Sequence, residues 1–185
     1  MSGKLYYEID DASYYYEIEG SGGPVVLLHG FTGTTDTWAA FIEAEKEQFQ
    51  LISIDLPGHG KTQTSTPITM EKCCADIVQL LRELQVTDVH LIGYSMGGRT
   101  ALSFAMLYPE KVKTLILESA SPGLKLQIER EDRITNDEKL AQKIENEGIH
   151  SFIDFWENIP LFQTQKNLSQ QVKEKIRKER LGQNE

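Results

Sequence analysis

The residues Gly93-Tyr94-Ser95-Met96-Gly97 place a serine between two glycines in the pattern G-x-S-x-G. An apolar run typical of a strand precedes this pattern and a helical pattern follows it, so Ser95 is expected on a sharp strand-to-helix turn. The glycines would remove the side chains that clash in such a turn. The Ser95 hydroxyl would stand at a helix N-terminus, where negative charge is favoured. The pattern therefore predicts a reactive serine; the alternative is a tight glycine turn with a surface serine.

A second segment, residues 55–62, ends in Gly60-Lys61-Thr62 and invites comparison with a phosphate-binding loop. That loop requires G-x-x-x-x-G-K-[ST], and Asp55 stands where its first glycine should be. Pro57 and Gly58 instead favour a turn after a buried strand. We therefore predict a turn here and no phosphate loop.

The elements that must position these residues alternate between strands and helices. Residues 5–9 and 14–18 alternate apolar and polar side chains, which favours an antiparallel hairpin. Continuous apolar runs follow, as expected for strands buried on both faces, at 25–28, 51–54, 89–92 and 114–117. Apolar residues also recur at helical spacing from Met70 to Leu84. This order indicates an α/β fold with a mostly parallel sheet, helices on both faces, and ligand binding at the carboxyl ends of the strands.

The pattern changes after Pro122, where buried strands give way to charged helical segments. These segments cover residues 127–146, 149–157 and 168–181. No low-complexity linker separates the two parts. The sequence therefore predicts an incomplete core at residues 1–122 and a helical cap, or lid, at residues 123–185.

Composition excludes several functional classes. A net charge of −9 disfavours binding to nucleic acid or anionic lipid. The basic stretch 173–180 is interleaved with glutamates and is expected to be a solvated helix face. The two cysteines, Cys73 and Cys74, are neighbours in a helical pattern and are expected to pack in the core. We expect no cofactor, metal ion, membrane span or signal peptide, and a cytoplasmic location.

Four motifs, each at the end of a predicted strand, resemble those of the α/β-hydrolase superfamily: residues 29–31, 55–60, 93–98 and 118–123. The resemblance implies an α/β-hydrolase fold with a helical cap that lacks the last strands and helices. It also implies an oxyanion hole made by the backbone N–H groups of Phe31 and Met96. The alternative for Phe31 is a role as core filler.

A narrower resemblance is to the 2-succinyl-6-hydroxy-2,4-cyclohexadiene-1-carboxylate synthases of menaquinone biosynthesis, through residues 97–99, 121–124, Arg130, Arg133, 155–156 and 160–162. It implies a lyase that eliminates pyruvate from a carboxylate-rich small molecule, with Ser95 as base. Arg99 lies one helical turn after Ser95, so its guanidinium can reach the pocket and clamp a carboxylate. The candidate substrate-binding residues are Tyr94, Arg99, Arg133 and Trp156; a surface position for the arginines and simple packing for Trp156 remain alternatives.

The sequence after Ser95 does not show the catalytic partners that the superfamily resemblance implies. The superfamily places an acid and then a histidine after the cap, whereas the only histidine after Ser95 is His150. His29 is expected in the oxyanion loop, with a role as base as the alternative. We therefore expect a truncated, inactive chain.

The same truncation would leave the strand at 114–117 without a neighbour and allow self-association. Two further functions stay open. One is an ester or peptide hydrolase with Ser95 as covalent nucleophile, and the other is a non-catalytic binding protein.

Overall fold

The computed structural model describes residues 3–183. The chain divides into two compact units, Met1–Pro122 and Gly123–Glu185. The division falls where the sequence changes from buried strands to charged helices. Each unit has an apolar core of its own.

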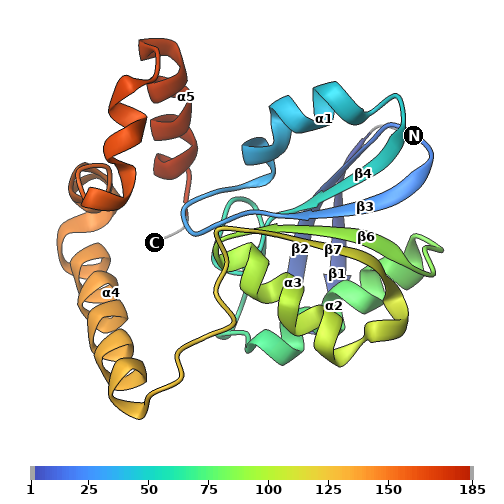
Figure 1. Ribbon diagram of the computed structural model, residues 1–185, viewed down its shortest axis with the longest axis horizontal. Coiled ribbons are helices and arrows are strands. Elements are labelled where there is room, and N and C mark those ends of the chain that lie inside the picture. Colours follow the sequence, from blue (N-terminus) through green and yellow to red (C-terminus); the bar gives the residue numbers. More distant parts are fainter. Residues whose placement is uncertain (1–2, 184–185) are drawn as a thin grey trace. The chain divides into compact units, whose positions relative to one another are not determined.

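The first unit is built on a mixed β-sheet in the order β1-β2-β4-β3-β6-β7, with β5 paired to β2 (Figure 1). The strands are β1 (Gly3–Ile9), β2 (Ala12–Glu19), β3 (Gly23–Leu28), β4 (Phe49–Ile54), β5 (Gln63–Thr64), β6 (Val89–Tyr94) and β7 (Val112–Glu118). The four strands that contain the apolar runs are parallel, as predicted. The predicted hairpin β1–β2 and the β2–β4 pair are antiparallel. The expected mostly parallel sheet is therefore mixed, because the hairpin occupies one end of it.

Helices cover both faces of this sheet, which confirms the predicted α/β architecture. They are η1 (Thr35–Trp38), α1 (Ala39–Glu45), α2 (Met70–Glu83), α3 (Met96–Leu107) and η2 (Pro109–Lys111). Figure 1 shows α1 on one side of the sheet and α2 and α3 on the other. Leu27 of β3 and Leu51 of β4 pack with Trp38 and Ile42. The adjacent residues Leu28 and Ile52 point to the other face and pack with residues of α2 and α3. Alternate residues of each central strand therefore enter two different core clusters.

Helix α2 has the start and the buried face that its sequence predicts. The Thr69 side chain caps the helix by accepting the N–H of Lys72 at 3.2 Å. Cys73 and Cys74 are free thiols buried in the core, as predicted. Burial raises the pKa of Cys73 to about 12, so this thiol stays protonated at neutral pH.

The prediction that residues 114–117 are buried on both faces is wrong. Strand β7 pairs only with β6 among the strands of residues 3–122, and it ends the sheet. Ile116 and Leu117 are 50% and 39% exposed. The run is apolar like those of the central strands, but an edge strand lacks the neighbours that would cover it.

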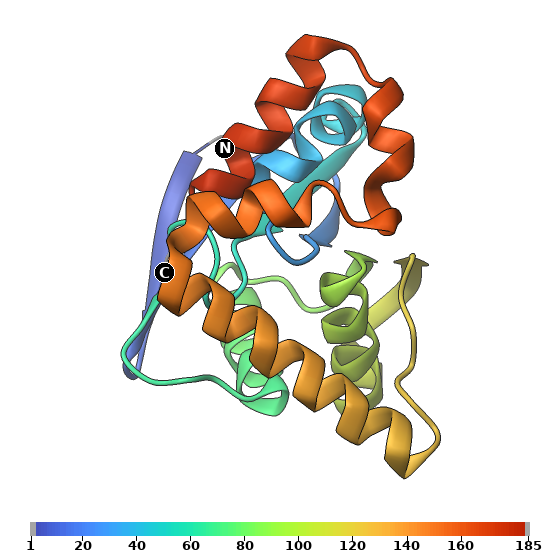
Figure 2. The ribbon, with the colours of Figure 1, turned by 90° about the vertical axis from the view of Figure 1, so that its left-hand side faces the viewer.

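The second unit is helical, with α4 (Gln127–Trp156), η3 (Pro160–Asn167) and α5 (Gln170–Leu181). Helix α4 changes direction at Gly148, whose φ of 77° and ψ of 164° are not helical (Figure 2). Glycine adopts this backbone conformation without a Cβ penalty. The break separates the two helices that the sequence predicts at 127–146 and 149–157. Only the second arm is well buried, through Ile149, Phe152 and Ile153.

Candidate active site

Ser95 lies on the predicted strand-to-helix turn, between the end of β6 and the start of α3. Its φ of 52° and ψ of −111° are unusual for a residue with a side chain. Such backbone strain costs about 1–3 kcal/mol and must be held by the surroundings. The Ser95 N–H donates to the Glu118 carbonyl at 2.9 Å, and the Ser95 carbonyl accepts the Arg99 N–H at 3.1 Å. The turn is therefore anchored to β7 on one side and to the first turn of α3 on the other.

The glycines that flank Ser95 allow a close approach of backbones. A Cβ on Gly97 would lie 2.2 Å from the Leu28 carbonyl oxygen and 2.4 Å from that of His29. A Cβ on Gly93 would lie 2.4 Å from the Gly97 carbonyl oxygen. Both positions exclude any side chain, so the glycines are needed to hold Ser95 beside the end of β3.

His29, directly after β3, is fully buried and bonded through both ring nitrogens. Nε2 accepts the Leu56 N–H at 2.9 Å, so Nδ1 carries the proton and donates to the Gly30 carbonyl at 2.8 Å. Burial, with a smaller effect of neighbouring His59, lowers the pKa of His29 to about 3. The alternative role of His29 as the base for Ser95 is therefore wrong. The ring instead ties the loop after β3 to the loop after β4.

Asp55 ties the same two loops a second time. Its buried carboxylate accepts the Thr35 N–H at 2.7 Å and the Lys61 N–H at 2.8 Å. A Cβ on Gly60 would lie 2.1 Å from an Asp55 carboxylate oxygen. Burial raises the pKa of Asp55, and the two N–H groups act in the opposite direction. The predicted turn is confirmed, because residues 57–61 form turns in which Gly58 and Gly60 have positive φ.

The residues proposed for the oxyanion hole lie at the ends of β3 and β6. Met96 is the first residue of α3, where a backbone N–H has no partner within its own helix. Phe31 is 39% exposed, and its ring meets the edge of the His59 ring with centroids 5.6 Å apart. The alternative that Phe31 fills the core is therefore wrong. The next residue, Thr32, also has a positive φ, of 65°.

A base for Ser95 is missing from the described part of this unit. No hydrogen bond joins a histidine to the Ser95 hydroxyl within residues 3–122, and both nitrogens of His29 are engaged. His59 uses Nδ1 to bond the Pro57 carbonyl at 3.0 Å. His90 lies near the start of β6, roughly 16 Å along the strand from Ser95. His150 belongs to the second unit.

The candidate substrate-binding residues near Ser95 differ in exposure. Tyr94 is half-buried and packs with the core cluster that contains Trp38. Its ring lies against Gly30, where a Cβ would come within 2.7 Å. Arg99, in the first turn of α3, is exposed. A guanidinium one turn from Ser95 thus remains accessible to an anionic ligand.

The two candidate substrate-binding residues of the second unit, Arg133 and Trp156, differ in their surroundings. Arg133 is exposed, and its Nε lies 2.7 Å from both carboxylate oxygens of Asp137 on the next turn of α4. Trp156 stacks on Phe152 and meets the edge of Phe162, with ring centroids 5.5 and 5.6 Å apart. The Trp156 ring thus packs against two aromatic rings of its own unit, whereas Arg133 lies on the surface in a local ion pair.

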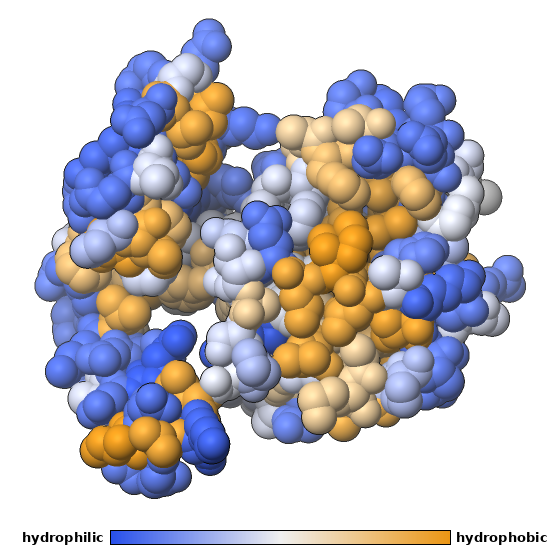
Figure 3. Space-filling model, in the orientation of Figure 1, coloured by the Kyte–Doolittle hydropathy of each residue, from blue (hydrophilic) through white to orange (hydrophobic). Residues whose placement is uncertain are grey.

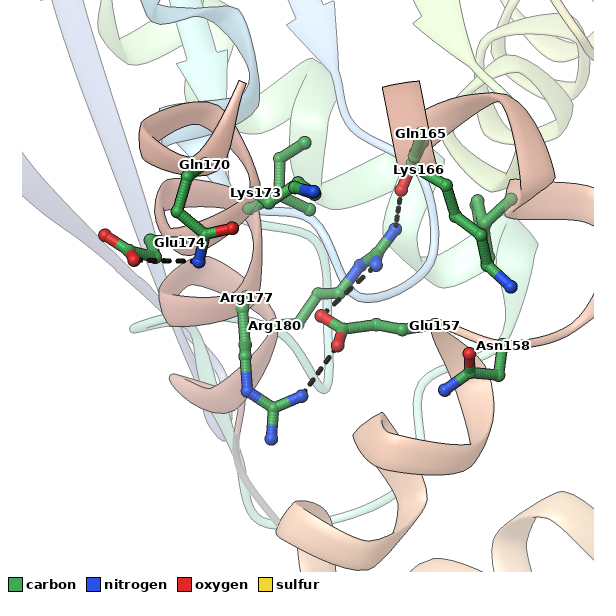
Figure 4. Close-up of a pocket in the computed structure, with 11 residues that line it drawn as sticks. Glu157, Asn158, Gln165, Lys166, Gln170, Lys173, Glu174, Arg177 and Arg180 are labelled. Carbon is green, nitrogen blue, oxygen red and sulfur yellow. Dashed lines mark hydrogen bonds and ion pairs between the residues drawn. The ribbon is translucent and has the colours of Figure 1, made fainter. Parts of the chain in front are cut away.

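Sequence reasoning missed a cluster of charged side chains in the second unit (Figure 4). A pocket of about 260 Å³ is lined by Glu157, Asn158, Phe162, Gln165, Lys166, Gln170, Lys173, Glu174, Ile176, Arg177 and Arg180. Arg177 binds the Glu157 carboxylate at 2.6 Å, and Arg180 binds Gln165 at 3.0 Å and lies over the Phe162 ring. Arg180 is only 6% exposed, so the expected solvated face of residues 173–180 is wrong at this position. The i, i+3 spacing of the two arginines was the available signal.

Two classes of site find no support in residues 3–183. No group of three or more histidine, cysteine, aspartate or glutamate side chains there is arranged to hold a metal ion. Over the same described residues, no helix has the length and apolar character that a bilayer crossing requires.

Comparison with known proteins gives a consistent picture. Residues 23–184 match the family described as alpha/beta hydrolase fold. A provisionally named 2-succinyl-6-hydroxy-2,4-cyclohexadiene-1-carboxylate synthase of Bacillus subtilis (strain 168) is 44% identical over 163 residues, covering 86% of this chain and 59% of that protein. The synthase of the same name from Enterobacter sp. (strain 638) is 28% identical, over 75% of this chain and 53% of that protein.

Solved structures are similar as well. MenH from S. aureus has a TM-score of 0.84 and 34% identity, and the match covers 95% of this chain and 66% of that one. The chain thus spans between 53% and 66% of the length of these three relatives.

Proposed function

Because the chain belongs to the α/β-hydrolase fold family, we propose that it is the Ser95-bearing part of a menaquinone-pathway lyase. The reaction would eliminate pyruvate to form 2-succinyl-6-hydroxy-2,4-cyclohexadiene-1-carboxylate. The observation that carries this proposal is the 44% identity with the Bacillus subtilis relative over 86% of the chain. Since the chain spans only 59% of that relative, the activity is proposed for the longer protein.

Ser95 is the proposed base. As its hydroxyl proton is removed, the Ser95 oxygen would take a proton from the substrate ring. The electron pair left behind would form a double bond as the C–O bond breaks, and pyruvate would leave as its enolate and take up a proton. The hydroxyl proton of Ser95 would first pass to a histidine held by a carboxylate, groups that the longer protein would have to supply because no histidine within residues 3–122 bonds the Ser95 hydroxyl. The strained turn keeps the hydroxyl at the start of α3, which supports this role.

The N–H groups of Phe31 and Met96 are proposed to stabilise the enolate-like charge. Losing one such donor typically costs about 2.7–4 kcal/mol of transition-state stabilisation. His29 and Asp55 tie the loop that carries Phe31 to the loop after β4, and Gly97, next to Met96, packs against the carbonyl oxygens of Leu28 and His29, which supports a preformed site. Such a site needs no reorganisation when charge develops.

The substrate is proposed to be a small molecule with several carboxylates. Exposed Arg99, one turn from Ser95, would bind one carboxylate, and Tyr94 would line the pocket. Arg133 and Trp156 of the proposed cap complete the set, Arg133 by exchanging Asp137 for a substrate carboxylate. We propose a cytoplasmic location, which the two free buried cysteines favour.

A serine hydrolase is the second candidate, because the same turn and donors would serve an acyl-enzyme mechanism. A non-catalytic binding protein is the third. The three proposals predict different reactions of one protein. The lyase releases pyruvate, the hydrolase gives a burst with an activated ester, and the binding protein does neither.

The experiment is pyruvate release from the menaquinone-pathway precursor, measured with three proteins. They are this chain, a chimera that continues it with the remaining part of the Bacillus subtilis relative, and the chimera with Ser95→Ala. We expect release only from the chimera with Ser95. A burst with an activated ester and no pyruvate would favour the hydrolase, and equal release after Ser95→Ala would rule out the assigned base.

A further inference from the structure

Residues with a left-handed backbone gather at one end of the sheet. Within residues 3–183, the residues other than glycine with a positive φ are Asp10, Thr32, Gln85, Ser95 and Ser119. Thr32, Ser95 and Ser119 follow the carboxyl ends of the adjacent parallel strands β3, β6 and β7. Asp10 lies in the turn between β1 and β2, and Gln85 follows α2. Strained backbone persists only where the surroundings hold it, and it concentrates at functional sites.

The residue before Ser119 bonds the candidate reactive serine. Tyr94 and Glu118 are partners in the register of β6 and β7. One residue further along the chain, Ser95 donates its N–H to the Glu118 carbonyl at 2.9 Å. This carbonyl belongs to the peptide group that joins Glu118 to Ser119. The φ of Ser119, 51°, therefore sets the orientation of this peptide group relative to the chain that follows.

The residue after Ser119 packs on the same strand-to-helix turn. A Cβ on Gly98 would lie 2.5 Å from the Ala120 Cβ, so Ala120 lies against the first turn of α3. The same Cβ would lie 2.9 Å from the Gly93 carbonyl oxygen, at the other side of Ser95. Ser119 is thus flanked by two contacts with the Ser95 turn, one from a carbonyl group and one from a methyl group.

Apolar packing does not account for the conformation of Ser119. Residues 114–117 of β7 are apolar apart from Thr114, and Figure 3 shows a hydrophobic area on the face of the first unit where β7 runs. Ser119 comes after this run, and serine has almost no apolar surface to bury. The contacts of its two neighbours are therefore what holds its backbone.

We propose that Ser119 is a positioning residue for Ser95. Its left-handed backbone holds the Glu118 carbonyl on the Ser95 N–H and Ala120 on Gly98, and these contacts keep the strained Ser95 turn in place. The Ser119 hydroxyl has no part in this role. The effect on catalysis rests on the proposed function of Ser95, whereas the contacts themselves are independent of the reaction.

The first test is amide hydrogen exchange of the Ser95 N–H in this chain, measured by NMR relative to the Leu91 N–H in the middle of β6. Ser119→Val should speed this exchange about tenfold or more, because a β-branched residue disfavours a positive φ. Ser119→Gly should change it by less than about threefold, since glycine adopts this φ without cost. Ser119→Thr keeps the hydroxyl and adds the branch, so it should lie between them, and it gives the test if Ser119→Val does not fold.

Gln85→Val is the matched control. Gln85 has a similar φ of 57° but precedes the amino end of β6, whereas Ser95 follows the carboxyl end of that strand. The variant adds the same backbone strain, so it should lower the overall stability much as Ser119→Val does. Exchange at Ser95 relative to Leu91 should stay within about twofold of the parent chain.

The second test is pyruvate release by the chimera with the remaining part of the Bacillus subtilis relative. Ser119→Val should lower kcat about tenfold or more and change KM by less than about threefold, because a displaced Ser95 impairs the chemical step more than binding. Ser119→Gly should retain most of kcat, and Gln85→Val should keep it within about twofold.

Three outcomes would overturn the proposal. They are an unchanged Ser95 exchange in Ser119→Val, equal effects of Ser119→Val and Ser119→Gly, and an unchanged kcat in a variant whose Ser95 exchange has increased. Equal effects of the two variants would assign the role to the hydroxyl. A parent chimera that releases no pyruvate would instead contradict the proposed lyase, and the exchange rates would still decide whether Ser119 holds Ser95.

Discussion

The two units hold their charged and reactive residues by different means. In the first unit, His29 and Asp55 are buried and bond backbone N–H groups of Leu56, Thr35 and Lys61. In the second unit, Glu157 is held by other side chains, those of Arg177 and Arg180. Geometry set by backbone groups tolerates few substitutions, whereas geometry set by long side chains can adjust. The first unit therefore fixes its buried polar side chains through the backbone, whereas the second unit fixes Glu157 through other side chains.

The largest expected effect is at the turn that carries Ser95. Gly97→Ala should lower the free energy of unfolding by about 3 kcal/mol or more, because its Cβ would meet the Leu28 carbonyl oxygen. Gly182→Ala in the second unit, with no contact closer than 3.4 Å and no positive φ, should change it by less than about 0.5 kcal/mol. Urea unfolding followed by circular dichroism measures both. Similar values for the two variants would contradict the contrast between the units.

The next effect concerns His29. His29→Phe should lower the free energy of unfolding by about 2–3 kcal/mol at pH 7, because the buried Leu56 N–H and Gly30 carbonyl lose their partner. His29→Gln should lose less, since its side-chain carbonyl can accept the Leu56 N–H. Urea unfolding of the three proteins gives the comparison, and equal losses for both variants would argue against the hydrogen bond.

His29 also predicts a dependence on pH. Its pKa of about 3 in the folded chain lies below the ordinary value of 6.5, so the unfolded chain binds the proton first. This contribution to stability is complete above pH 6.5 and is lost as the pH falls towards 3, by up to about 1.4 kcal/mol per pH unit. The difference in stability between the parent chain and His29→Phe should shrink over this range. A constant difference would contradict the assignment of a neutral buried ring.

The smallest effects are expected in the second unit. Arg180→Met should lower the free energy of unfolding by about 1–3 kcal/mol, since it removes buried contacts with Gln165 and Glu157. Arg133→Met should cost less than about 0.5 kcal/mol, because its ion pair with Asp137 is exposed. Thermal unfolding of both variants measures this. An equal cost would show that burial does not decide the strength of these contacts.

The sequence predicted those features that depend on backbone conformation. Periodicity located the strands and helices, and the glycines beside Ser95 located the turn. It predicted that the strand at 114–117 has no neighbour on one side, but it was wrong about the burial of these residues, because an apolar run has the same pattern in a central and in an edge strand. It also misjudged Arg180, since a helical charge pattern does not reveal which arginine faces a phenylalanine and a glutamine far along the chain. The hydrogen bond between His29 and Leu56 could not be predicted, because it joins two loops whose relative position only the structure shows.

The most direct test of the proposed roles of the two units is to measure kcat and KM for pyruvate release. The proteins compared are the chimera with the Bacillus subtilis relative, the same chimera with Ser95→Ala, and the same chimera with Arg133→Gln. If the first unit carries the chemistry and the second binds substrate, Ser95→Ala lowers kcat by a factor on the order of 10³ or more. Arg133→Gln then raises KM and leaves kcat within a few-fold. A full kcat after Ser95→Ala, or an equal loss of kcat in both variants, would contradict the account.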